Sequence, residues 1–204
     1  MSQAFSFLLV LDFEATCAES NAPTPQEIIE FPSVLLARET MRTVSEFEAF
    51  VRPVHHPILT PFCRDLTSIR QADVDQAATF PEVFARHQRW VKDQQLTADN
   101  TLILTCGDWD LKTMLPAQQT ASGQPLHDLP PLYTRWHNIK RAFSKCMGRR
   151  RNSGMTSMLG TLGLPLIGTH HRGIDDCRNI VEICRKLVER GAEIDVTGSV
   201  PRSS

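Results

Sequence analysis

FSFLLVLDFEATC, at residues 5–17, is the stretch that decides the fold. Its continuous apolar run predicts a buried β-strand, Phe5–Phe13, that ends in acidic residues. Because alternate side chains of a strand share one face, Asp12 and Glu14 are expected to point the same way and Phe13 the opposite way. Two adjacent carboxylates repel each other unless a cation lies between them, so the pair indicates a metal site. Taken alone, D-x-E is better explained by two solvated acids at the end of a strand.

The remaining chain carries further strand and helix patterns. Strands are also predicted at Ile28–Ala37, Val44–Val51 and Thr101–Cys106, and the first three strands are expected to form an antiparallel meander. Helices are predicted at Pro61–Ile69, Phe80–Gln95, Asp108–Leu115, Tyr133–Met147 and Thr156–Leu162, and a last one from a cap at Asp175 or Asp176 to Gly191. This order predicts an α/β fold with a mixed β-sheet flanked by helices. We expect one domain over residues 1–193 and a polar C-terminal tail, residues 194–204, that frays.

Composition and cysteine usage limit the class of protein. Hydrophobic residues make up 41% and charged residues 22% of the chain, which is ordinary for a globular protein in solution. The apolar run Phe5–Leu11 is too short to cross a bilayer and, with no Lys or Arg before Arg38, is a poor signal peptide. None of the six cysteines lies in a C-x-x-C pair, which favours reduced thiols. We therefore expect an intracellular protein, cytoplasmic or nuclear, that does not contact membranes.

A basic segment is hidden behind the formal net charge of −1. Between Leu129 and Ile174 there is no Asp or Glu, but there are eight basic residues: Arg135, Lys140, Arg141, Lys145, Arg149, Arg150, Arg151 and Arg172. Such a block predicts a surface that binds phosphate groups. A solvated helix face or loop explains the same pattern equally well.

Two later segments supply further acids and a pair of histidines. GDWD at residues 107–110 follows a predicted strand, a common place for catalytic groups in α/β folds, but Asp108 or Asp110 could instead cap a helix. HHRGIDD at residues 170–176 places imidazoles, which titrate near neutral pH, in a glycine-flanked loop before a helix. Acids at that helix start are stabilised by the helix dipole, and one of them can also bind a metal. Paired histidines are more often surface residues, so only the order of all these segments carries the hypothesis.

That order resembles the Asp-Glu-Asp-Asp-His exonucleases, a 3′–5′ nuclease superfamily with a ribonuclease H-like fold. The chain is similar, within this superfamily, to the Eri1-like RNA exonucleases. The resemblance runs from about Leu8 to Gly191. Its matching motifs are D-F-E-A-T-C at Asp12–Cys17, E-I-I-E-F-P at Glu27–Pro32, F-x-x-x-V-R-P ending at Pro53, F-C-x-x-L-T-x-I from Phe62, T-F-P-x-V at Thr79–Val83, C-G-D-W-D at Cys106–Asp110, N-I-K at Asn138–Lys140 and H-x-G-I-D-D ending at Asp176.

The resemblance implies a role for each matching residue. It makes the metal ligands Asp12, Glu14, Asp110 and Asp176, and it makes His171 the catalytic base. It favours Asp110 over Asp108, His171 over His170 and Asp176 over Asp175, which leaves the two rejected acids as helix caps or supporting groups. The expected nucleotide contacts are Phe62 and Trp109, which would stack on the terminal base, and Thr16. The basic loop with Arg149, Arg150 and Arg151 is expected to contact a duplex backbone.

The implied function is a metal-dependent 3′–5′ exonuclease that hydrolyses RNA, at single-stranded 3′ ends or overhangs, to nucleoside 5′-monophosphates. Two Mg²⁺ (or Mn²⁺) ions would stabilise the entering and leaving oxygens, while His171 removes a proton from the attacking water. The expected partner is nucleic acid, RNA in preference to DNA, and we expect a monomer. Two alternatives stay open: a DNA-directed 3′–5′ exonuclease, and a nucleic-acid-binding scaffold with an idle site.

Overall fold

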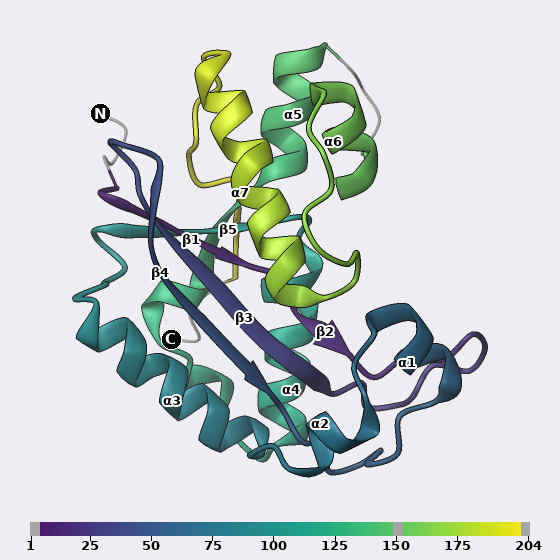
Figure 1. The fold of residues 1–204 in the computed structure, drawn as a ribbon. Coiled ribbons are helices and arrows are strands. Elements are labelled where there is room, and N and C mark those ends of the chain that lie inside the picture. The colour runs from purple at the N-terminus through teal and green to yellow at the C-terminus, as the bar shows by residue number, and fades with distance from the viewer. Residues whose placement is uncertain (1–4, 149–152, 201–204) are drawn as a thin grey trace.

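A seven-stranded mixed sheet lies at the centre of the part of the chain described by the computed structural model, residues 5–148 and 153–200 (Figure 1). Its strands run in the order β2-β3-β1-β5-β6-β7, and β4 pairs with β3. β3 is antiparallel to β1, β2 and β4, whereas β1, β5 and β6 are parallel. The bounds are β1 Phe7–Leu11, β2 Glu14–Ala15, β3 Ile28–Ala37, β4 Arg42–Phe50, β5 Thr101–Thr105, β6 Arg135–Asn138 and β7 Gly198–Ser199. The predicted α/β class and the antiparallel meander are confirmed.

Helices cover both faces of this sheet (Figure 1). The α-helices are α1 Pro61–Thr67, α2 Gln71–Asp75, α3 Phe80–Asp93, α4 Leu115–Ala121, α5 Ile139–Met147, α6 Met155–Leu162 and α7 Gly173–Glu189. Shorter turns of other helix types are η1 Asp110–Met114, η2 Leu126–Asp128 and η3 Pro131–Thr134. Along β1, Leu8 and Val10 pack with α5, α6 and α7, while Leu9 and Leu11 pack with α3 and α4. A strand buried on both faces needs apolar residues at every position, which explains the continuous apolar run.

The helix predicted over Tyr133–Met147 is wrong in its first half. The structure has the turn η3, the strand β6 and only then the helix α5. β6 pairs in parallel with β5, with Trp136 opposite Ile103, and the Trp136 side chain is buried. Pairing with a strand distant in sequence overrides the local helical pattern here, as it often does for short strands.

Two predictions near the C-terminus also need correction. α7 begins at Gly173 after Arg172, so Asp175 and Asp176 lie in its first turn and neither is the cap. The expected fraying from Ile194 is wrong as far as Val200, because Ile194 is buried and β7 pairs with β6. The polar segment is held by its partner strand, which its composition does not reveal. Residues 201–204 lie outside the described part of the chain.

Candidate metal centre

Four carboxylates from three parts of the sequence converge at one edge of the sheet. Oxygens of Asp12, Glu14 and Asp176 all lie within 4.8 Å of one another. Asp110 joins them through its Oδ1 atom, which accepts a hydrogen bond of 2.9 Å from the backbone N–H of Phe13. Glu14, Asp110 and Asp176 are all buried. Burial excludes the explanation of Glu14 as a solvated group at a strand end, and Asp12 beside it is only partly exposed.

The parallel pairing of β1 with β5 brings these acids together. Val10 lies opposite Leu104, so the carboxyl ends of both strands meet at the same edge, where α/β folds commonly place their sites. The strand breaks after Leu11 and resumes as β2 at Glu14, and the intervening Phe13 turns away to pack edge-on against Phe31 at 4.7 Å. Asp12 and Glu14 therefore both point towards the acid cluster, as their alternation along the strand predicted.

The electrostatics of this cluster favour bound cations. Burial, followed by the charges of Asp110, Glu14 and Asp176, raises the pKa of Asp12 well above its usual value. Burial, followed by Asp176 and Glu30, raises the pKa of Glu14 to about 9. Burial also raises the pKa of Asp110 to about 6 and raises the pKa of Asp176. Desolvation opposes the ionisation of all four acids, and neighbouring carboxylates add to it at Asp12 and Glu14. Divalent cations would remove that penalty.

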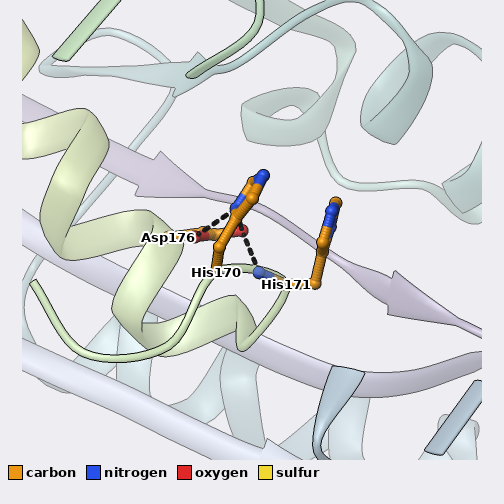
Figure 2. Close-up of side chains that lie close together, drawn as sticks. All are labelled: His170, His171 and Asp176. Carbon is orange, nitrogen blue, oxygen red and sulfur yellow. Dashed lines mark hydrogen bonds and ion pairs between the residues drawn. The ribbon is translucent and has the colours of Figure 1, made fainter. Parts of the chain in front are cut away.

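The loop with His170 and His171 leads into α7 and contacts Asp176 in the first turn of that helix (Figure 2). His170 Nδ1 lies 3.1 Å and 3.2 Å from the two oxygens of Asp176, and the backbone N–H of His171 donates to Asp176 Oδ2 at 2.9 Å. The two imidazoles stack with their centroids 3.8 Å apart. His171 has a φ of +65°, a conformation that is costly for a residue with a side chain. Burial, and then the neighbouring His170, lowers the pKa of His171.

Comparisons with known proteins agree with this geometry. Residues 9–184 match the model of the family described as Exonuclease. The chain belongs to the exonuclease family. It is 44% identical to ERI1 exoribonuclease 3 of Homo sapiens over 191 residues, which are 93% of this chain and 56% of that protein. It is 36% identical to 3′-5′ exoribonuclease 1 of Homo sapiens over 195 residues, which are 94% of this chain and 55% of that protein. The chain thus spans about half the length of these curated relatives.

A solved structure carries the same fold. The nuclease domain of 3′hExo, a DEDDh family member bound to rAMP, superposes with a TM-score of 0.90 at 34% identity, covering 98% of this chain and 100% of that one. The resemblance to the Eri1-like exonucleases is therefore confirmed, together with the fold that it implied. The exonuclease fold implies divalent metal cofactors, and the four clustered acids with raised pKa values fit them. No helix in residues 5–148 and 153–200 is long and apolar enough to span a membrane.

The acids that the resemblance rejected are engaged elsewhere in this exonuclease fold. Asp108 accepts a hydrogen bond of 2.8 Å from Trp136 Nε1, and its backbone oxygen accepts from the N–H of Lys112. Asp175 accepts from the N–H of Thr169 at 2.9 Å and forms an ion pair with Arg178. Neither carboxylate therefore needs a metal to be satisfied.

The predicted nucleotide contacts lie in different surroundings. Phe62 in α1 and Trp109 before η1 are 39% and 40% exposed, so both rings offer surface to a ligand. Thr16 is only 3% exposed, and its Oγ1 accepts a hydrogen bond of 2.9 Å from the N–H of Glu27, which leaves it little surface for a nucleotide. The predicted basic contacts fall outside the described residues, these being Arg149, Arg150 and Arg151.

Two residues near the cluster were given no role at the metal centre from the sequence. The ammonium of Lys140, in the first turn of α5, lies close enough to Asp12 and Asp110 to oppose the rise in their pKa values. Glu30 in β3 is fully buried and lies directly opposite Glu14 in the sheet. Both belong to motifs shared with the Eri1-like exonucleases, N-I-K and E-I-I-E-F-P, which was the available signal.

Proposed function

We propose that this chain is a 3′–5′ exoribonuclease, which hydrolyses RNA at single-stranded 3′ ends or overhangs and releases nucleoside 5′-monophosphates. The observation that carries the proposal is the convergence of four carboxylates in one cluster: Asp12 directly after β1, Glu14 of β2, Asp110 of η1 and Asp176 of α7. The preference for RNA is supported by relatives that are named exoribonucleases. All four acids come from one chain, which supports action as a monomer.

The proposed ligands of two divalent cations, Mg²⁺ or Mn²⁺, are Asp12, Glu14, Asp110 and Asp176. An all-oxygen set of carboxylates suits these hard ions better than it suits zinc or copper. When bound, the ions would neutralise charge on the attacked phosphate and lower the pKa of water. The raised pKa values of the acids support this role, because cations would restore their ionised forms.

The remaining groups would place the substrate and move protons. His171 acts as the general base that takes a proton from the attacking water, and the lowered pKa keeps its imidazole neutral and able to accept one at neutral pH. Phe62 and Trp109 hold the terminal base between them by stacking, which tolerates any base. Thr16 would contact the nucleotide through the little surface it exposes, and Arg149, Arg150 and Arg151 would contact a duplex backbone.

The location proposed for the protein is intracellular. None of the six cysteines is in a disulfide, and Cys63, Cys177 and Cys184 are buried, which suits a reducing compartment.

The proposed function is tested by digesting matched RNA and DNA oligonucleotides, labelled at the 3′ or the 5′ end, with Mg²⁺ or with EDTA. We expect stepwise shortening of RNA from the 3′ end with Mg²⁺ and none with EDTA. The Asp12→Ala variant should be inactive, and undiminished activity in it would refute the site. Faster shortening of DNA than of RNA would favour a DNA-directed enzyme, and binding without shortening would favour a scaffold.

A further inference from the structure

The carboxylate of Glu30 is buried, and both of its oxygens contact groups from residues 172–174 at the start of α7. Its side chain has no exposed surface. Its Oε2 accepts a hydrogen bond of 3.0 Å from the N–H of Gly173, and its Oε1 accepts one of 3.2 Å from the N–H of Ile174. The Arg172 guanidinium lies 3.3 Å from Oε1. A buried carboxylate persists only when it is paired and hydrogen-bonded in this way, so these three contacts account for its presence.

The positions of these partners in the chain connect Glu30 to the proposed metal centre. Residues 172–174 lie between His171 and Asp176, at the first turn of α7. Glu30 itself lies on β3 directly opposite Glu14 of β2. The Glu30 side chain therefore connects two parts of the proposed site. It extends from the strand that pairs with Glu14 to the segment that carries His171 and Asp176. The accepted N–H groups belong to the start of α7, where a negative charge is also favoured by the helix dipole.

Arg172 extends this connection to the neighbouring strand. Its guanidinium bridges Glu30 to Glu48 of β4, at 2.6 Å from Glu48 Oε1, and lies over the Phe50 ring at 4.4 Å. The histidine that precedes it, His171, is in the left-handed conformation. A residue in a strained backbone conformation persists only when its neighbours are held in place. The ion pairs of Arg172 hold the residue that follows His171.

Close packing at Gly173 fixes the same segment against the first strand. A Cβ atom at Gly173 would lie 2.9 Å from the backbone oxygen of Asp12 and 2.9 Å from Cγ of Pro32. The backbone at the start of α7 therefore lies directly against the backbone of Asp12, a proposed metal ligand. Only a residue without a side chain permits this approach, so the spacing between α7 and β1 is tightly set.

We infer that Glu30 is a positioning residue for the metal centre: through Gly173, Ile174 and Arg172 it holds His171 and Asp176 in register with Asp12 and Glu14. This inference rests on the proposed function. Mutation of residues that orient metal ligands typically lowers metal affinity or activity by about 10–100-fold. Loss of Glu30 would thus act on the metal centre without removing any ligand.

The test compares Glu30→Gln with the parent in two independent measurements. Glutamine keeps the volume and one acceptor oxygen but removes the charge that Arg172 meets. Titration with Mn²⁺, followed by electron paramagnetic resonance of the free ion, should show a dissociation constant raised by about 10–100-fold. RNA shortening, measured well below the unfolding temperature, should need a correspondingly higher Mg²⁺ concentration for half-maximal rate, with little change in KM for RNA.

The matched control is Glu27→Gln. Glu27 is also buried, precedes the same strand and accepts three backbone N–H groups, from Val54, His55 and His56, in the loop between β4 and α1. Its loss should lower the unfolding temperature and leave the affinity for Mn²⁺ unchanged. Equal loss of affinity in both variants would show that general destabilisation is responsible and would overturn the inference.

A second variant decides the case if Glu30→Gln does not fold. Arg172→Lys keeps the charge but cannot bridge both acids, so it should weaken Mn²⁺ binding in the same direction by a smaller factor. Parental Mn²⁺ affinity in the folded variant would refute the inference. If the parent binds Mn²⁺ but does not shorten RNA, the proposed function fails, while the Mn²⁺ titration still decides the role of Glu30.

Discussion

At neutral pH, we expect the carboxylate cluster to make the metal-free protein less stable than a variant that lacks one of the acids. Glu14 illustrates the effect, because burial and the neighbouring Asp176 and Glu30 raise its pKa from 4.5 to about 9. A group with a raised pKa in the folded state contributes its full stability only below the pKa of the unfolded chain. That contribution is lost as the pH rises from about 4.5 towards about 9.

The magnitude at pH 7 follows from this shift. Between pH 4.5 and pH 7 the unfolded chain releases the Glu14 proton while the folded protein retains it. Each pH unit costs about 1.36 kcal/mol, so the folded state loses about 3 kcal/mol over this interval. The neutral side chain in Glu14→Gln avoids that loss. We expect the variant to be up to about 3 kcal/mol more stable in EDTA, equivalent to roughly 6–12 °C in a chain of this size.

Thermal unfolding in EDTA at pH 5 and pH 7 measures this difference, with exposed Glu39→Gln as the control. The parent should lose more stability than Glu14→Gln between the two pH values, whereas the control should follow the parent. Mg²⁺ should then stabilise the parent more than the variant, because a ligand that binds only the folded state adds to its stability. An unfolding temperature for Glu14→Gln at or below that of the parent in EDTA at pH 7 would refute the reasoning.

Three further predictions test other parts of the site. His171→Ala should reduce single-turnover cleavage by about 10²–10⁴ and change KM little, and a larger loss in His170→Ala would assign the base to that residue instead. Trp109→Ala and Phe62→Ala should each weaken RNA binding by about 1–3 kcal/mol, measured by fluorescence anisotropy, and unchanged affinity would exclude stacking. Gly173→Ala places a Cβ within 2.9 Å of two other atoms and should destabilise the fold by about 1–3 kcal/mol in chemical unfolding, an effect that a freely adjusting helix start would not show.

Much of the fold was predictable because its signals are local. The bounds of β3, Ile28–Ala37, agree with the prediction, since a buried strand is one apolar run between polar segments. The start of α3 at Phe80 also agrees, because Thr79 and Glu82 form a capping box. The four-residue strand β6 was missed, since its burial at Trp136 depends on the distant strand β5. No local pattern reports such a partner.

The residue types of the site were likewise determined by sequence alone. Acids that follow buried strands, and a histidine five residues before another acid, indicated an oxygen-rich centre, and the resemblance to the Eri1-like exonucleases chose among the candidate residues. Their spacing and their pKa values depend on how deeply the sheet and α7 bury them.

Only the tertiary structure revealed the partners of Glu30. In the sequence it is one acid in an apolar strand, and its accepted N–H groups lie 143 and 144 residues away. Hydrogen bonds and burial depend on distance in space, so a side chain's function can be set by groups that its own neighbourhood in the chain does not contain.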